Sequence, residues 1–336
     1  MVFNDNFGSS MAQEIAEAPG TFRDCIRADC VADNVIDRLR NAAAFYTVAR
    51  GSSDAVATIL AYEFMRELRC PTTSLPPSIF SLNDGLHLEG AGVLVISQSG
   101  ASEDLVLSAR AARKHGALVC AITNVPDSAV EQAVDATLSV NAGIEHAVPA
   151  TKTVIGSIAK GMNLLAKLSP AYAKSAEHAA QEFPVDVCTT SFENLVSGLV
   201  QAQNIYVVGR GAGLGAAQEI ALKLKECCAL HAEAYSASEV LHGPLQLVIK
   251  PLTVLILDTE EKSTQDSLDR AEARFVQSGC NVYRLRPSKL GASDLTPAAA
   301  AALLIYALYP MIKEAAVALG YNPDVPNTLS KITVTV

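Results

Sequence analysis

The sequence lacks the features that mark membrane-spanning and secreted proteins. None of its apolar runs reaches the roughly 18–20 consecutive residues that a spanning helix needs. Its first residues, MVFNDNFGSSMAQEIAEAP, contain no basic segment followed by an apolar one, so we expect no secretory signal. We therefore expect a cytoplasmic protein that does not bind a membrane.

The sequence also lacks the residue spacings that are typical of disulfide and metal sites. Its eight cysteines form no C-x-x-C pair, and its six histidines form no H-x-x-x-H pair. Without a secretory signal, the cysteines are expected to be free thiols in a reducing compartment. We accordingly predict no metal site.

An excess of positive charge is absent too. The chain has 35 acidic and 26 basic residues, and its formal net charge is -9. An overall basic surface for nucleic acid is therefore not expected, and we predict no nucleic-acid partner. An acidic protein can still bind an anionic substrate through backbone amides and hydroxyl groups.

Apolar segments are plentiful, since half of the 336 residues are hydrophobic. Short apolar runs, typical of parallel strands buried on both faces, alternate with helical patterns such as 52–68 and 102–116. This alternation predicts an α/β fold with a parallel sheet and helical crossovers. The predicted strands are AFYTVA (44–49), GVLVIS (92–97), LVCAIT (118–123), NIYVVG (204–209), LTVLIL (252–257) and NVYRL (281–285).

The order of elements occurs twice along the chain. FYTVARGSSDAVATILAYEFMREL begins at Phe45, and IYVVGRGAGLGAAQEIALKLKECC begins at Ile205. Both segments contain a strand, an Arg-Gly pair, small residues and a long helix. We predict two tandem copies of one three-layer αβα unit, with domains at 25–168 and 187–336, joined by a helical connection over 169–190. One continuous sheet is the alternative.

Two hydroxyl-rich turns follow neighbouring predicted strands. The turn SQSGAS (97–102) offers Ser97, Ser99 and Ser102 where a strand meets a helix, and ARGSSD (49–54) offers Ser52 and Ser53. Ligands of doubly wound sheets bind at these strand ends, and a helix start there favours an anion. The turns therefore indicate a phosphate site without a Walker or G-x-G-x-x-G pattern. The alternative is that the serines only cap helices.

Charged residues gather in KLKECCALHAEAYSASEVLHGP (223–244) and again in the tail. Lys223 and Glu226 share a face of an otherwise apolar helix, and His242 lies in a Gly-Pro turn, a setting that suits acid–base chemistry. Lys331 lies in a proline-containing end, YNPDVPNTLSKITVTV (321–336), which could fold back onto the protein. A solvated ion pair, a structural histidine and an exposed lysine are the simpler alternatives.

Taken together, these stretches resemble the sugar isomerase (SIS) family of phosphosugar-binding proteins. The likeness is greatest to the SIS-type glucosamine-6-phosphate deaminases and to the isomerase half of glucosamine-6-phosphate synthase. It extends from about residue 30 to the end, and it predicts two tandem SIS subdomains. The matching stretches are ARGSSD, ISQSGASED, ITNVPDS, NAGIEHAVPATKT, ALKLKECCALHAEAYSASEVLHGP and NTLSKITVTV.

The resemblance implies a substrate-binding set. One turn would hold the sugar phosphate, a second would line the sugar, and a third stretch would also contact the sugar. Position 150 is alanine here, where the synthases often have serine, so one hydroxyl contact is missing. The implied residues are Ser97, Gln98, Ser99 and Ser102 for the phosphate, and Gly51, Ser52, Ser53, Val148 and Ala150 for the sugar.

The resemblance also implies catalytic roles. Glu226 would be the base that moves a proton between C1 and C2, and Lys331 would form a Schiff base with the ketose. His242 would open the sugar ring and would reach a neighbouring subunit's site, which implies a homodimer. Lys223 would lie beside the base, and we hypothesise that its charge lowers the pKa of Lys331.

The sequence contains no segment like the glutaminase domain of the synthases. We therefore expect the direction that releases ammonia, from glucosamine 6-phosphate and water to fructose 6-phosphate, without a metal or an organic cofactor. Galactosamine-6-phosphate deaminase and fructosamine-phosphate deglycase are the enzyme alternatives. A phosphosugar-sensing module is the non-enzymatic one.

Overall fold

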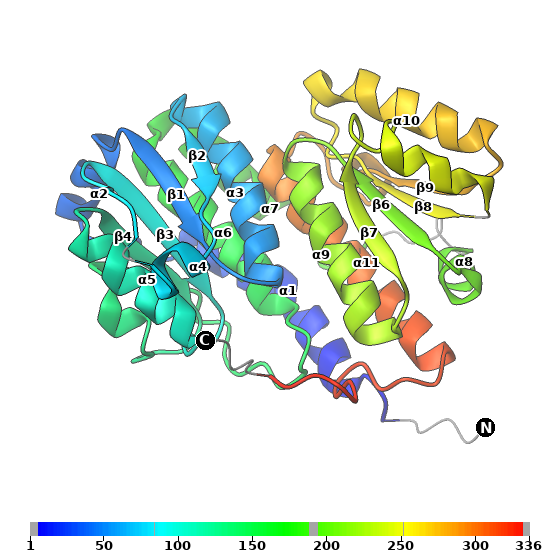
Figure 1. Cartoon of the computed structure of the whole chain (residues 1–336), viewed down its shortest axis with the longest axis horizontal. Coiled ribbons are helices and arrows are strands. Elements are labelled where there is room, and N and C mark those ends of the chain that lie inside the picture. Colours follow the sequence, from blue (N-terminus) through cyan, green and yellow to red (C-terminus); the bar gives the residue numbers. More distant parts are fainter. Residues whose placement is uncertain (1–5, 84, 188–193, 251, 332–336) are drawn as a thin grey trace. The chain divides into compact units, whose positions relative to one another are not determined.

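The computed structural model of the chain describes residues 6–83, 85–187, 194–250 and 252–331. They form two compact units (Figure 1). The N-terminal unit contains Gly20–Ile144 and Lys152–Gln181. The C-terminal unit contains Glu182–Lys331, Glu145–Thr151 and the described part of Met1–Pro19. The predicted boundaries, 25–168 and 187–336, stay a prediction, and residues 332–336 lie outside the described part.

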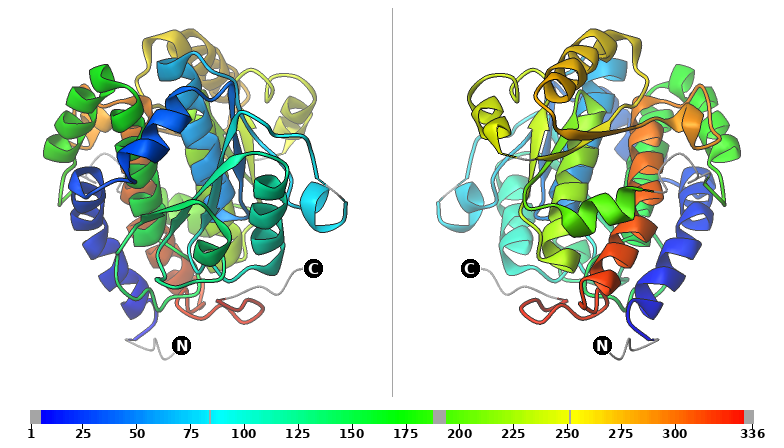
Figure 2. Two further views of the ribbon diagram at one scale, coloured as in Figure 1. Left: turned by 90° about the vertical axis from the view of Figure 1, so that its left-hand side faces the viewer. Right: turned by 90° about the vertical axis from the view of Figure 1, so that its right-hand side faces the viewer.

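The N-terminal unit is built on a parallel five-stranded sheet in the order β2-β1-β3-β4-β5. All seven residues of β3 are buried, because helices cover both faces of the sheet (Figures 1 and 2). The strands are β1 (Ala44–Val48), β2 (Thr72–Ser74), β3 (Ala91–Ser97), β4 (Leu118–Thr123) and β5 (Ala136–Ser139). The helices are α2 (Asp33–Arg40), α3 (Ser52–Leu68), α4 (Ser78–Ser81), α5 (Glu103–Lys114), α6 (Lys152–Leu168) and α7 (Pro170–Glu182).

The C-terminal unit repeats this plan with a parallel four-stranded sheet in the order β7-β6-β8-β9. Helix α10 packs on one face of the sheet, with Leu268 and Phe275 against Tyr206 and Ile256. The strands are β6 (Ile205–Gly209), β7 (Ala232–Ser236), β8 (Thr253–Leu257) and β9 (Asn281–Leu285). The helices are α8 (Leu195–Gln201), α9 (Ala212–Cys228), α10 (Gln265–Gln277) and α11 (Pro297–Ala318), and α1 (Ser9–Arg27) begins in this unit.

The internal repeat is confirmed down to the backbone angles. Gly51 starts α3 with φ 55° and ψ -130°, and Gly211 starts α9 with φ 58° and ψ -133°. Both helices have 17 residues and end at a residue in the left-handed conformation. Positive φ favours glycine at both turns. The tandem αβα prediction is therefore correct, and the alternative of one continuous sheet is wrong.

Among the described residues, α11 alone is long and apolar enough to span a membrane, by length and composition only. Its most apolar 18-residue window has a mean hydropathy of 1.4, and 78% of that window is buried inside the protein. It packs along α9 in the C-terminal unit, which accounts for the apolar surface. The absence of charge from most of α11 is thus explained by core packing.

Candidate active site

The predicted phosphate turn lies at the carboxyl end of β3. The Ser97 hydroxyl accepts a hydrogen bond from the Gly100 N–H (3.1 Å), and the Ser99 hydroxyl accepts one from the Ala101 N–H (3.3 Å). Ser102 is the residue before α5, but its side chain makes no capping hydrogen bond. The helix-cap alternative therefore does not account for Ser102, and its hydroxyl is available to a ligand at the start of α5.

The second hydroxyl-rich turn lies beside the first. Strands β1 and β3 are paired, with Val48 opposite Val95, so their carboxyl ends meet at one edge of the sheet. Arg50, at the β1 end, donates from Nε to the buried carboxylate of Asp104 in α5. A cavity of about 440 Å³ opens at this edge. Its lining is Ala49, Arg50, Gly51, Asp54, Ser74, Leu75, Pro76 and Pro77. The pairing of β1 with β3 and the contact of Arg50 with Asp104 place the two turns side by side, but among the predicted binding residues only Gly51 lines the cavity.

Gly100 is required by the shape of the phosphate turn, so we expect Gly100→Ala to disrupt it. Gly100 has φ 60°, and an added Cβ would lie 2.2 Å from the Ser128 hydroxyl. The substitution should cost about 1–3 kcal/mol of strain and should shift the turn. Because the turn is predicted to hold the sugar phosphate, the affinity for a phosphosugar should fall about tenfold. Calorimetric titration with fructose 6-phosphate measures the effect.

Gly90 provides the matched control for this substitution. It has φ 75° at the other end of β3, and a Cβ there meets nothing within 4 Å. Gly90→Ala should leave the affinity within about twofold, because it adds strain outside the site. Equal losses of affinity in the two variants would contradict a specific role for the turn.

The predicted base, Glu226, belongs to a buried charge network in the C-terminal unit. The Lys223 ammonium lies 2.6 Å from Glu226 Oε2 and 3.2 Å from Glu219 Oε1. The Tyr309 hydroxyl donates to Glu219 at 2.9 Å. Burial alone would lower the pKa of Lys223, but the two carboxylates outweigh burial and raise it. Burial, reinforced by Glu219, raises the pKa of Tyr309.

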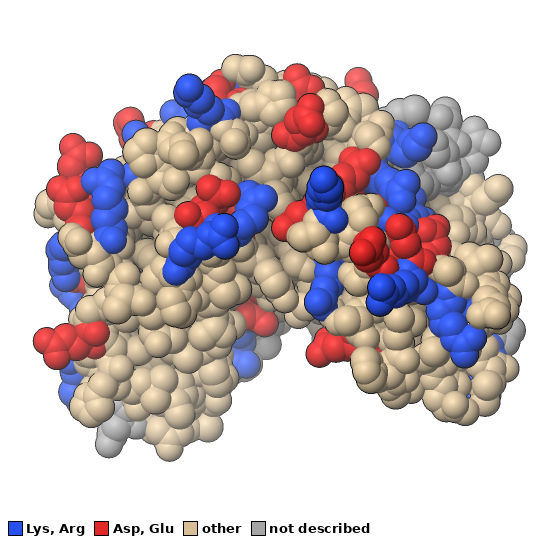
Figure 3. Space-filling view, turned by 90° about the horizontal axis from the view of Figure 1, so that it is seen from above, with Lys and Arg blue, Asp and Glu red and all other residues tan. Residues whose placement is uncertain are grey.

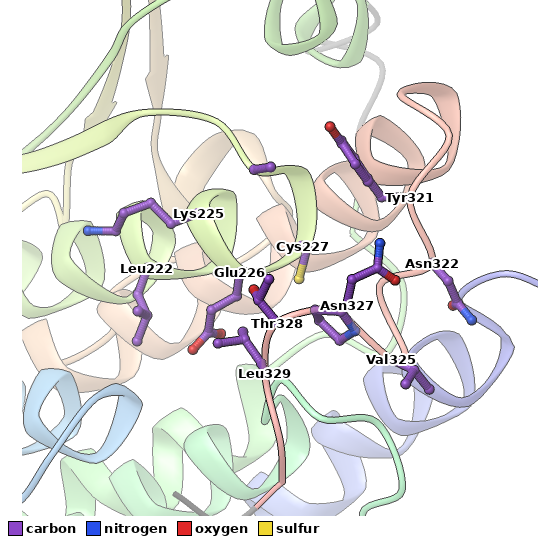
Figure 4. Close-up of a pocket in the computed structure, with 12 residues that line it drawn as sticks. Leu222, Lys225, Glu226, Cys227, Tyr321, Asn322, Val325, Asn327, Thr328 and Leu329 are labelled. Atoms are coloured by element: carbon purple, nitrogen blue, oxygen red, sulfur yellow. The ribbon is translucent and has the colours of Figure 1, made fainter.

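Glu226 differs from the rest of this network because it reaches solvent. Its side chain is 22% exposed, whereas those of Lys223 and Glu219 are 1% and 0% exposed. Its carboxylate points into a cavity of about 420 Å³ between the end of α9 and the tail (Figure 4). The other lining residues are Leu222, Lys225, Cys227, Ala229, Tyr321, Asn322, Val325, Pro326, Asn327, Thr328 and Leu329. Glu226 is thus a fixed carboxylate that a small molecule can reach.

The tail lies against the loop 145–151, a possibility that the sequence left open, and places Lys331 beside it. The Lys331 ammonium donates to the Ala147 carbonyl at 2.6 Å and lies 3.4 Å from Glu145 Oε2. The Val148 N–H donates to the Asp324 carbonyl at 2.8 Å. The loop that contains Val148 and Ala150 is therefore bound to the tail.

The hypothesis about Lys223 and Lys331 gains no support from these contacts. Lys223 lies between Glu219 and Glu226, and Lys331 lies beside Glu145. One positive charge facing two carboxylates leaves no excess positive field to act on another amine. The contacts of Lys223 favour a role in holding Glu226.

The structure does not bring His242 to the residues predicted to act with it. His242 is exposed, its Nδ1 lies 3.0 Å from the Ser238 carbonyl oxygen, and it lines neither cavity described above. It precedes a 3-10 helix, Gly243–Ile249, in which no residue is buried. The predicted site residues are thus found in three places: the sheet edge of the N-terminal unit, the α9 and tail region of the C-terminal unit, and this exposed turn.

Several polar residues of these regions were not predicted from the sequence to belong to a site. Glu219 lies four residues before Lys223, and that spacing on one helix face could have identified it. Tyr309, Glu14 and Asp324 had no such signal, because their partners are distant in the sequence. Among the described residues, no group of three or more His, Cys, Asp or Glu side chains is placed to hold a metal ion.

The chain resembles known proteins over most of its length. The SIS domain model matches residues 38–166 and 198–280. The glutamine–fructose-6-phosphate aminotransferase (isomerizing) of Sulfurisphaera tokodaii is 31% identical over 339 residues, which cover 97% of this chain and 56% of the relative. That of Aeropyrum pernix is 34% identical over 271 residues, which cover 73% of this chain and 43% of the relative. The chain therefore spans about half the length of these curated relatives.

Solved structures share the fold. A protein proposed to be a phosphosugar isomerase, from Silicibacter pomeroyi, is 32% identical with a TM-score of 0.80, covering 94% of this chain and 99% of that one. The glucosamine-6-phosphate deaminase of Thermotoga maritima is 19% identical with a TM-score of 0.74, covering 97% of this chain and 100% of that one. At that identity, the second match is evidence for the fold alone.

Proposed function

Because the chain belongs to the SIS domain family, we propose that it is an amino-sugar phosphate deaminase of the aldose–ketose isomerase type. It converts glucosamine 6-phosphate and water to fructose 6-phosphate and ammonia. The observation that carries this proposal is the Glu226 carboxylate, which Lys223 holds at 2.6 Å and which borders an open cavity. A fixed carboxylate that is partly shielded from water suits proton transfer between adjacent carbons.

The proposed reaction needs an acid that opens the ring, a base that moves one proton between carbons, and one water molecule. His242 protonates the ring oxygen and opens the pyranose. Glu226 takes the proton from C2 and returns it to C1, which leaves an imine at C2. Water adds to this imine, and ammonia leaves as the C2 ketone forms. Lys331 supplies the amine that can form a Schiff base with that ketone.

The N-terminal unit would bind the substrate through its phosphate. The hydroxyls of Ser97, Ser99 and Ser102 and the start of α5 lie at the same sheet edge as Gly51. Neutral donors and a helix start stabilise an anion without a lysine. This supports phosphosugar binding by a chain whose formal net charge is -9.

We further propose that the enzyme is a cytoplasmic homodimer in which His242 acts in the partner's site. His242 is exposed, and the adjoining 3-10 helix exposes Leu247 (51%) and Ile249 (76%). Apolar side chains beside an exposed candidate acid favour burial against a second copy. On the face drawn in Figure 3, basic and acidic side chains are interspersed, which does not favour a nucleic-acid partner.

Product release from defined substrates tests the proposed function. Ammonia and fructose 6-phosphate are measured after incubation with glucosamine 6-phosphate. Ammonia is also measured with galactosamine 6-phosphate, and the released amino acid is measured with a fructosamine 6-phosphate, which is a sugar–amino-acid adduct. We expect ammonia and fructose 6-phosphate from the first compound, and the reverse reaction when ammonium is added to fructose 6-phosphate. Binding of glucosamine 6-phosphate without turnover would favour the sensing module. Turnover of galactosamine 6-phosphate alone would favour the galactosamine-6-phosphate deaminase, and turnover of the fructosamine 6-phosphate alone would favour the deglycase.

A further inference from the structure

The N-terminal helix α1 anchors the tail. Both carboxylate oxygens of Asp324 accept hydrogen bonds from its first turn, from the Ser10 N–H at 3.0 Å and the Met11 N–H at 2.8 Å. The first N–H groups of a helix have no partner within the helix, so this cap satisfies two of them. The Asp324 carbonyl also accepts from Val148. The tail is therefore fixed seven residues before Lys331.

The same helix also anchors the loop 145–151. Glu14, one turn into α1, accepts hydrogen bonds at Oε1 from the His146 N–H and from the Ala147 N–H. The carbonyl of Ala147 in turn accepts the hydrogen bond from the Lys331 ammonium at 2.6 Å. A continuous set of hydrogen bonds thus leads from the helix to the amine.

Glu14 occupies this place at an energetic cost. Its side chain is buried, and Oε2 has no hydrogen-bond partner among the described residues. Burial, with the nearby charge of Glu145, raises its pKa even though the two backbone N–H groups lower it. Burying a carboxyl group with one unpaired oxygen costs free energy, which the two hydrogen bonds at the other oxygen offset only in part.

We propose that Glu14 and Asp324 are positioning residues, and that α1 holds Lys331 and the Val148–Ala150 stretch at the distance the reaction needs. This inference rests on the proposed function, because it takes Lys331 as the amine that meets the sugar. Residues from the first and last parts of the chain then form one site with the loop 145–151. Loss of either anchor frees the lysine without removing any group that touches the substrate.

The reactivity of the Lys331 amine measures its position without a substrate. The protein is pulsed with acetic anhydride, and acetylation of Lys331 is followed by mass spectrometry with the exposed Lys262, which lies outside the cavity, as internal reference. We expect Glu14→Ala and Asp324→Ala to raise the Lys331 rate about tenfold, because local opening exposes the amine. Glu17→Gln, an exposed position on the same helix, is the matched control and should leave the rate unchanged.

Conservative variants separate positioning from general damage. Glu14→Gln keeps an oxygen that can accept both N–H bonds, so its Lys331 rate should be close to that of the wild type. Asp324→Asn keeps one acceptor oxygen and should raise the acetylation rate of Lys331 about threefold. This smaller effect can still be measured if the alanine variants do not fold. In the proposed deaminase reaction, Glu14→Ala should lower kcat about tenfold and change KM by less than about threefold, because Lys331 meets the reacting carbon and not the phosphate.

The outcomes distinguish the two proposals. Faster acetylation in Glu14→Ala and Asp324→Asn, with Glu17→Gln unchanged, supports the anchoring role. Wild-type acetylation rates in both variants would overturn it, whatever the activity. If acetylation rises but the wild-type protein turns over no phosphosugar, the anchoring role stands and the proposed function fails.

Discussion

Replacing Glu226 by glutamine should lower kcat for glucosamine 6-phosphate by about 10²–10⁴-fold, the usual contribution of a general base. The amide has the shape of the carboxylate but cannot accept and return the C2 proton. Fructose 6-phosphate should still bind with nearly wild-type affinity, since the proposed phosphate contacts are those of Ser97, Ser99 and Ser102 and the substitution leaves them unchanged. Ammonia release gives kcat, and calorimetric titration gives the affinity.

A second glutamate of the C-terminal unit provides the control that shows whether the effect is specific to Glu226. Glu314 lies in α11 and is exposed. Glu314→Gln makes the same chemical change away from the cavity and should keep kcat within about twofold. If Glu226→Gln retained more than about a third of the wild-type kcat, Glu226 could not be the proton carrier.

The second large effect is expected on stability, from removing the charge of Lys223. Lys223→Met fills a similar volume but removes the cation that faces the buried carboxylate of Glu219 and the partly exposed carboxylate of Glu226. Breaking a buried ion pair in this way should lower the free energy of unfolding by about 3–5 kcal/mol at pH 7. Urea unfolding measures it, and the exposed Lys225→Met is the control, with an expected change within about 0.5 kcal/mol.

The direction of the pKa shift fixes the pH range for this experiment. The pKa of folded Lys223 is raised above the ordinary value of 10.5. Its contribution to stability is therefore fully present below that value and is lost only as the pH rises through the folded pKa.

The double variant Lys223→Met/Glu219→Gln should recover part of the loss, because one uncompensated charge is removed. A loss below about 1 kcal/mol in Lys223→Met would contradict the network described here.

Much of the fold was predictable because central strands carry a simple signal. The buried runs of β3 and β8 stand out as continuous apolar segments, and all their residues are buried. The edge strands β2, β5 and β7 were missed, because β2 and β5 have only three and four residues, and β7 is half-buried and contains Glu233. An edge strand needs neither a long nor an all-apolar sequence, so the periodicity of the sequence does not identify it.

The candidate site was predictable only where its contacts are local. Lys223 and Glu226 are three residues apart on one helix, and their ion pair is present. The contacts of Asp324 with Ser10 and Met11 join residues more than 300 positions apart. Such a contact depends on the tertiary fold, and no spacing in the sequence indicates it. For the same reason, the sequence does not indicate the hydrogen bond from Tyr309 to Glu219.

Transfer of a deuterium label tests the central claim, that Glu226 moves the proton between C1 and C2, most directly. Glucosamine 6-phosphate deuterated at C2 is incubated with the enzyme in ordinary water, and NMR follows the label at C2 of the substrate and at C1 of the product. The account predicts deuterium at C1 of fructose 6-phosphate with the wild-type protein, and neither transfer nor product with Glu226→Gln. Equal transfer by the two proteins, or a wild-type product without deuterium at C1, would contradict it.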